Sequence, residues 1–174
     1  MTNPSEKIAE VLDLNGGSLV GKTRLQKTLY FLEAANSGYG FDFQYYHYGP
    51  YSEELSVAAD EAILLGSIEQ KWAQSNKGHP YAVLRLGPNY KPEEKEKSEI
   101  KAAILKLLDQ YDPVSLELGA TAHFLRDSGY KDYWQETKIR KASKASPERL
   151  EKAKKLLTEF ENIQHQKSRK CQVD

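Results

Sequence analysis

The chain has 174 residues but only one cysteine, and it contains no long apolar segment. Cys171 has no second cysteine to pair with, so no disulfide can form within the chain, and a reducing compartment is expected. No apolar run approaches the roughly 20 residues that a membrane-spanning helix needs, and residues 1–15 lack the basic start and apolar centre of a signal peptide. These absences predict a cytoplasmic protein without membrane contact.

Lysine and arginine are absent between Lys27 and Lys71, although the formal net charge of the whole chain is zero. The gap includes a predicted helix at residues 53–65 that is acidic instead, with the sequence EELSVAADEAILL. In a helix-turn-helix protein the corresponding helix enters the major groove, and Lys and Arg neutralise the phosphates around it. An acidic helix at this place argues against reading of a DNA duplex and favours contact with another protein.

Short periodic segments divide the first half of the chain into helices and strands. Apolar residues at helical spacing predict helices at residues 4–14, 23–36 and 53–65, and alternation predicts strands at residues 41–48, 68–72 and 81–86. A capping box of Thr23 and Gln26 is expected to begin the second helix, Ser52 to cap the third, and Gly49-Pro50 to end the first strand. The glycines at 16 and 17 are interpreted as a turn between two helices.

The second half of the chain has the pattern of helices alone. Residues 91–110, 113–127, 130–140 and 147–163 are predicted to be helical, and Asp112 followed by Pro113 is expected to begin the second of them. The sequence therefore predicts a mainly α (α+β) fold. Residues 1–90 would form a winged-helix-like core with a small β-wing, residues 91–163 a helical extension packed on that core, and residues 164–174 a disordered tail.

Residues 16–23, GGSLVGKT, match the phosphate-binding loop pattern G-x-x-x-x-G-K-T letter for letter. Such a loop follows a buried parallel strand, whereas the preceding KIAEVLDL has helical periodicity and acidic residues within it. No apolar strand that ends in aspartate follows to bind magnesium. Thr23 is explained by the capping box, so a nucleotide-binding enzyme ranks only third among the functional hypotheses, and Lys22→Ala is expected to leave nucleotide affinity unchanged.

Other catalytic and metal-binding patterns are weaker still. His47, His79, His123 and His165 are scattered, with no pair at i,i+4 spacing and no cysteine partner, so a zinc site is not expected. The chain has no G-x-S-x-G motif. We therefore expect no catalytic residues, no cofactor and no metal.

Aromatic residues gather in one short segment, GYGFDFQYYHYGPYS, at residues 38–52. Two interpretations remain open: a packed structural corner, or a binding surface of tyrosine rings and hydroxyls, which are enriched at protein interfaces. The second interpretation places a partner-binding site at the junction of this segment with the second helix. Its predicted residues are Arg24, Lys27, Tyr46, Tyr48 and Tyr51.

Four sequence pieces resemble a known family. GKTRLQKTLYFLE, YHYGPYSEEL, LLGSIE and LELGATAHFL are similar to segments of the Panacea-type, or SocA-like, antitoxin domain and of its uncharacterised YwgA-like relatives, over roughly residues 6–163. The resemblance implies a winged-helix-like core with helical additions. For Panacea antitoxins it also implies neutralisation of a toxin by direct contact, sometimes as an adaptor to a protease.

These observations lead to a ranked set of functions. The first hypothesis is a non-enzymatic protein-interaction module in a toxin–antitoxin or defence system. The second is a winged-helix DNA-binding regulator, in which the wing and the basic helices at residues 138–155 would have to supply the positive charge that the acidic helix lacks.

Overall fold

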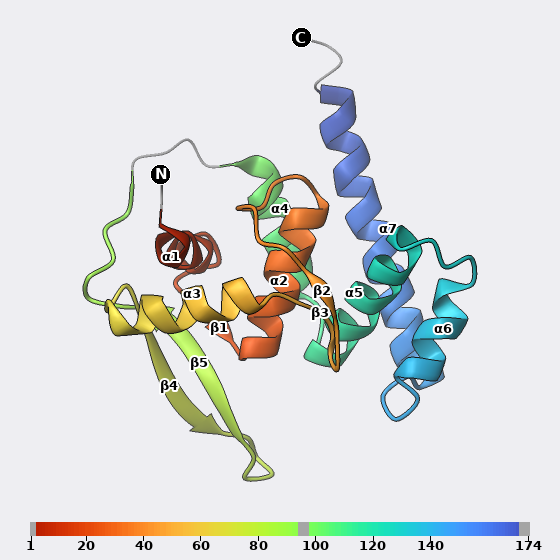
Figure 1. The fold of residues 1–174 in the computed structure, drawn as a ribbon, viewed down its shortest axis with the longest axis horizontal. Coiled ribbons are helices and arrows are strands. Elements are labelled where there is room, and N and C mark those ends of the chain that lie inside the picture. Colours follow the sequence, from red (N-terminus) through yellow and green to blue (C-terminus); the bar gives the residue numbers. More distant parts are fainter. Residues whose placement is uncertain (1–2, 94–97, 171–174) are drawn as a thin grey trace.

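The computed structural model describes residues 3–93 and 98–170. In chain order the elements are α1 (Pro4–Leu14), β1 (Ser18–Val20), α2 (Lys22–Ala34), β2 (Gln44–Tyr46), β3 (Gly49–Tyr51), α3 (Glu53–Leu64), β4 (Ile68–Gln74), β5 (Pro80–Leu86), α4 (Glu99–Asp109), α5 (Pro113–Asp127), α6 (Tyr133–Arg140) and α7 (Pro147–Lys170) (Figure 1). The protein is thus mainly helical, with two small antiparallel sheets, as the predicted α+β class requires. None of the helices in this part of the chain is both long and apolar enough to cross a membrane.

The larger sheet has three antiparallel strands in the order β1-β5-β4. The β4–β5 hairpin projects away from the helices (Figure 1), and its strands are slightly longer than the predicted 68–72 and 81–86. At its base Leu19, Ile68 and Leu84 are buried and join the hydrophobic core. The interpretation of the glycines at 16 and 17 as a turn between two helices was wrong, because the turn leads into β1, which pairs with β5 more than sixty residues further along the chain.

Helix α2 begins without the predicted capping box. Its N-cap residue is Gly21, with a φ of +93°, and no side chain caps the helix. Gln26 instead bonds Ser52 in both directions, donating to its carbonyl and accepting from its N–H, each at 2.9 Å. The prediction was wrong because a partner distant in sequence took the Gln26 side chain. Because Thr23 caps nothing, Thr23→Ala should not cost the roughly 1 kcal/mol of a lost cap. Ser52 does cap α3, accepting from the N–H of Leu55 at 3.2 Å.

The aromatic segment forms a hairpin rather than one strand. β2 and β3 pair in an antiparallel register, and His47 and Tyr48 form the turn between them. Gly49 and Pro50 begin the second strand, so the prediction that they only end a strand was wrong. Proline is tolerated here because the sheet has just two strands, and both are therefore edges.

Helices α6 and α7 pack on α5, which also contacts α2 and β3, whereas α4 packs on α7 and α2. Asp112 caps α5, as predicted, by accepting from the N–H groups of Val114 and Ser115. The two halves share one core, in which the rings of Phe31 and Phe160 lie 5.0 Å apart. The domain boundary at residues 90 and 91 stays a prediction.

Three boundaries in this half differ from the sequence prediction. α4 begins at Glu99 rather than at residue 91, and part of that predicted stretch, residues 94–97, lies outside the described residues. α6 begins three residues later than predicted. The predicted disordered tail was wrong for residues 164–170, which continue α7, because Gln164 donates to the carbonyl of Ala34 at the end of α2. Residues 171–174 lie outside the described part.

Candidate protein-contact site

Exposed tyrosines stand at the turn of the β2–β3 hairpin. Tyr46 and Tyr48 each expose 59% of their surface, a high fraction for side chains of this size. The Tyr46 ring stacks on Tyr51, with centroids 5.6 Å apart, and meets His47 edge-on at 4.8 Å. Large aromatic side chains that remain exposed while supporting one another are the type that protein interfaces use as anchors.

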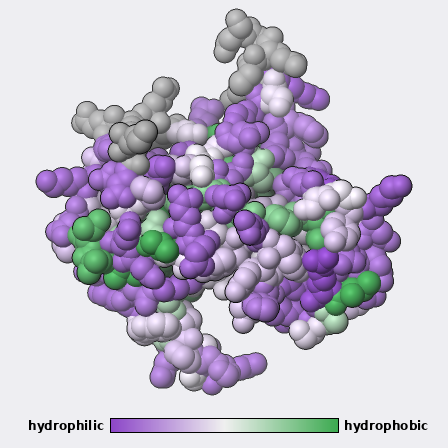
Figure 2. Space-filling view, viewed as in Figure 1, coloured by the Kyte–Doolittle hydropathy of each residue, from purple (hydrophilic) through white to green (hydrophobic). Residues whose placement is uncertain are grey.

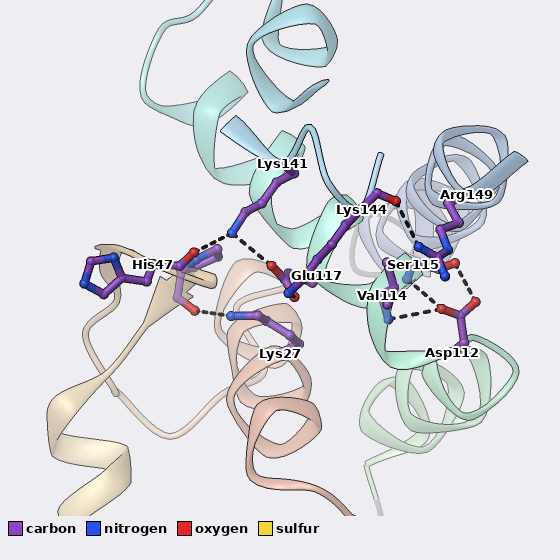
Figure 3. Close-up of polar contacts among 10 residues, drawn as sticks. Lys27, His47, Asp112, Val114, Ser115, Glu117, Lys141, Lys144 and Arg149 are labelled. Atoms are coloured by element: carbon purple, nitrogen blue, oxygen red, sulfur yellow. Dashed lines mark hydrogen bonds and ion pairs between the residues drawn. The ribbon is translucent and has the colours of Figure 1, made fainter. Parts of the chain in front are cut away.

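Buried side chains from α2 and from the segment after α6 bond the backbone of this hairpin (Figure 3). The ammonium of Lys27, in α2, donates to the carbonyl of Pro50 at 2.7 Å. The ammonium of Lys141, after α6, donates to the carbonyl of His47, also at 2.7 Å. Together with the paired bonds between Gln26 and Ser52, these contacts fix the backbone at three places within six residues. The tyrosines therefore project from a rigid support.

One carboxylate balances the lysines beneath the hairpin. Glu117, in α5, lies 2.9 Å from the ammonium of Lys141 and 2.8 Å from that of Lys144, as Figure 3 shows. Glu117, Lys141 and Lys27 expose 5% of their surface or less. Burial lowers the pKa of Lys27 to about 8; Glu117 opposes this shift, while Lys141 and Lys144 add to it. The site thus holds more positive than negative charge in a poorly hydrated place.

The hairpin approaches α5 so closely that a side chain could not fit between them. A Cβ at Gly49 would lie 2.5 Å from the Thr121 hydroxyl, and the φ of Gly49 is +85°. Both the contact and the backbone conformation require glycine. This close approach presses the hairpin turn against the helical half of the protein.

Cations from the second half also border the aromatic surface. The guanidinium of Arg140 lies 4.6 Å from the ring centroid of Tyr45, and the ammonium of Lys144 lies 4.9 Å from that of Tyr48. Both distances suit cation–π contacts. Neither cation was among the predicted site residues. The basic run KIRKASK at residues 138–144 was the sequence signal that could have identified them.

The five predicted site residues do not share one surface. The three tyrosines lie on the hairpin, as predicted, with Tyr51 less exposed than the other two. Lys27 is 1% exposed, so a partner cannot reach its side chain, and its place in the site is that of a support. Arg24 points to the end of α4, where it donates to the carbonyls of Leu108 at 3.1 Å and Tyr111 at 2.7 Å.

Replacement of Arg24 by alanine is expected to lower the free energy of unfolding by about 1.5–3 kcal/mol. The variant loses two hydrogen bonds from a charged donor, to the carbonyls of Leu108 in α4 and of Tyr111 just after it. Denaturant unfolding measures this change. Lys22→Ala is the matched control, since Lys22 forms an exposed ion pair with Asp60 and its loss should cost less than about 1 kcal/mol. Equal stability of the two variants would contradict the support role of Arg24.

The phosphate-loop pattern has an unsuitable conformation. β1 occupies residues 18–20, within the match, and pairs antiparallel with β5. A phosphate loop instead wraps its ligand with backbone amides between a parallel strand and a helix. Within residues 3–93 and 98–170 there is also no cluster of three or more histidine, cysteine or acidic side chains placed to hold a metal ion.

Comparison with known proteins gives one short match. No family model matches the chain. A segment of 56 residues is 30% identical to the uncharacterized protein YwgA of Bacillus subtilis (strain 168). The match covers 32% of this chain and spans about a third, 34%, of that protein's length. It indicates similarity to a YwgA-like protein and assigns no activity.

Proposed function

We propose that this chain is a non-enzymatic protein-interaction module that binds a partner protein through the aromatic hairpin. One observation supports the proposal most strongly: Tyr46 and Tyr48 are highly exposed, yet they stand on a backbone that Lys27 and Lys141 fix from inside. A rigid support reduces the ordering entropy lost on contact, so more of the contact energy is retained as affinity. The hydrophobic effect within the single chain would favour burying these rings, so their exposure needs another explanation.

The partner surface that fits this site carries acidic groups around an apolar centre. Tyr46 and Tyr51 would cover the centre, while Arg140 and Lys144 lie at the border. Arg140 is paired with Glu136 and Lys144 with Glu117, but Glu117 also serves Lys141, so the border keeps an excess of positive charge. The Panacea-like sequence pieces support a toxin as the partner within a toxin–antitoxin or defence setting. The order of α1 to β5 and the strand order β1-β5-β4 support a winged-helix class for this part of the chain.

DNA binding remains the alternative, but the exposed charges on α3 do not favour it. Glu53, Glu54 and Glu61 are exposed on α3, the helix that a winged-helix regulator would place in the groove. Negative side chains at that place repel phosphates. Basic residues of the β4–β5 hairpin would have to supply the whole attraction.

Loss of the exposed rings is expected to weaken partner binding without unfolding the protein. The Tyr46→Ala and Tyr48→Ala variants should each lose about 2 kcal/mol of binding free energy, or roughly thirtyfold in Kd, because exposed tyrosines at the centre of an interface are typical hot spots. A photo-crosslinking residue at position 48 would identify the partner, and calorimetry with that purified partner would measure the affinity of each variant.

Tyr81→Ala, on the β4–β5 hairpin, is the matched control, since Tyr81 is exposed but lies outside the aromatic hairpin. Its affinity should equal that of the unchanged protein. Melting temperatures of all three variants should stay within a few degrees of one another. If the folded Tyr46 and Tyr48 variants bind normally, the hairpin is not the contact site.

A further inference from the structure

The β4–β5 hairpin leaves one edge of the larger sheet open, and this edge does not depend on the proposed function of the aromatic hairpin. In the order β1-β5-β4, β4 is an outer strand, and no described strand pairs with its other side. Figure 1 shows no helix or strand of the described residues beside that edge, and in the space-filling view of Figure 2 the hairpin projects from the rest of the protein. A strand from another molecule can therefore reach β4 from solvent.

The bonds of the hairpin show which backbone groups point to the open edge. The N–H of Ser75 donates to the carbonyl of His79, and the N–H of Gly87 donates to the carbonyl of Ser67, each at 2.9 Å. Bonded pairs alternate along an antiparallel ladder, so the odd-numbered residues of β4 bond β5. The N–H and C=O groups of the even-numbered residues point to the open edge, where they bond no other described residue. These residues include Gln70, Trp72 and Gln74.

The open edge lacks most of the features that prevent strands from pairing. β4 has seven residues, contains no proline, and keeps one register with β5 along its whole length, without a bulge. Its lysine, Lys71, is paired with Glu69 of the same strand at 3.7 Å, so its charge is compensated. Natural edge strands are usually protected by a bulge, a proline or uncompensated charges. The backbone of β4 is therefore suited to pairing with another strand.

Trp72 places a large ring at the centre of this edge. It lies on the same face of the sheet as Ile68, which is buried at the base, yet it is 67% exposed because the hairpin projects beyond the helices. Tryptophan is among the residues that most often dominate interface energy. Contact with a second aromatic ring would remove this apolar surface from water.

We propose that β4 pairs with β4 of a second copy of this chain, antiparallel about a twofold axis at Trp72. Such an interface is self-complementary, so each residue has to suit its symmetric counterpart. With the axis at Trp72, the two indole rings oppose each other and Gln70 lies opposite Gln74 of the second copy. An axis at Lys71 would also bond the free backbone groups, but it would set two like charges opposite each other. The two sheets would then form one continuous antiparallel sheet.

The charges at the ends of the paired strands also fit this register. The tip of each hairpin lies opposite the base of the other, where α3 ends. Lys77, at the tip, would approach the C-terminal end of α3, which carries the negative end of the helix dipole and the exposed Glu61. Figure 2 shows exposed hydrophobic surface over this end of α3, where Leu64 and Leu65 are exposed, so contact with the tip would also cover apolar surface.

Sedimentation equilibrium of the full chain measures this association. The expected result is a reversible equilibrium between monomer and dimer, with the dimer dominant at millimolar concentration. Trp72→Lys should weaken dimerisation at least about a hundredfold, because two rings are lost and two ammonium groups oppose each other at the axis. Since Trp72 is exposed, the melting temperature of the monomer should not change.

Tyr81→Lys is the matched control for the added charge. Tyr81 is also an exposed aromatic residue of this hairpin, but it lies on β5 and on the opposite face of the sheet. The variant should dimerise as the unchanged protein does. A chain that stays monomeric at millimolar concentration, or an equal loss in Tyr81→Lys and Trp72→Lys, would overturn the proposal.

Cysteine cross-linking tests the register with Trp72 in place. In a Cys171→Ala background, a Gln70→Cys chain and a Gln74→Cys chain should form a disulfide with each other when they are mixed. The two positions oppose each other in a bonded pair, with Cα atoms about 5.5 Å apart, a distance that a disulfide can span. Neither chain alone should cross-link, because its two cysteines would lie about 14 Å apart along the strands. Absence of the mixed disulfide, or equal cross-linking of either chain alone, would contradict the pairing.

Discussion

Replacement of Glu117 by glutamine is expected to lower the free energy of unfolding by about 3–5 kcal/mol at pH 7, the usual cost of leaving a buried charge without its partner. Glutamine keeps the size of the side chain but removes the one carboxylate that contacts Lys141 and Lys144. Lys27 would also lose the negative charge that favours its protonated form. Denaturant unfolding of the variant and the unchanged protein measures the loss.

Two further variants distinguish this effect from a simple loss of contacts. Glu148→Gln removes an exposed partner of Lys152 and should cost less than about 1 kcal/mol. The double variant Glu117→Gln/Lys141→Met removes the buried carboxylate and one buried ammonium together, and it should be more stable than Glu117→Gln alone. A double variant less stable than Glu117→Gln would show that Lys141 stabilises the fold without needing Glu117.

The same cluster connects stability with the proposed contact surface. Lys141 contacts both Glu117 and the carbonyl of His47, so its position depends on the charge beneath the hairpin as well as on the turn. Among the described residues no third strand pairs with the hairpin, and a two-stranded hairpin alone is marginal in water. We therefore expect Glu117→Gln to weaken partner binding although Glu117 is 3% exposed and cannot touch a partner.

Local patterns in the sequence were sufficient to predict most helices. Asn3 and Pro4 begin α1, and Asp112 and Pro113 begin α5, because a capping side chain followed by proline satisfies exposed amides within a few residues. β1 was missed because three residues are too few to show alternation, and its partner β5 is distant in sequence. The disordered tail was predicted from polarity, which does not reveal that Gln164 reaches the end of α2.

The candidate site was predicted only in part, for a related reason. Tyr46 and Tyr48 were identified because seven aromatic residues lie close together in the sequence, and clustering is visible there. The role of Lys27 was not visible, since lysine on a helix is usually exposed. Its burial depends on a carbonyl 23 residues away and on Glu117 in another helix.

Lys27 should make the stability depend on pH in a defined direction. Its pKa is about 8 in the folded protein, against 10.5 for an ordinary lysine, so between these values the unfolded chain binds more protons than the folded chain. The free energy of unfolding must then rise with pH, by up to about 1.4 kcal/mol per pH unit. Across the whole window from pH 8 to 10.5 this contribution reaches about 3 kcal/mol.

The variant Lys27→Met isolates this contribution because methionine has a similar length and no proton to lose. At pH 7 the variant loses the bond to Pro50 but also avoids burying an ammonium, so its stability should be close to that of the unchanged protein. From pH 8 to 10 the unchanged protein should become progressively more stable than the variant. The other titratable groups are the same in both proteins, so their contributions cancel in the difference. Denaturant unfolding at pH 7, 8, 9 and 10 measures that difference, and a constant value across the series would show that Lys27 keeps an ordinary pKa in the folded protein.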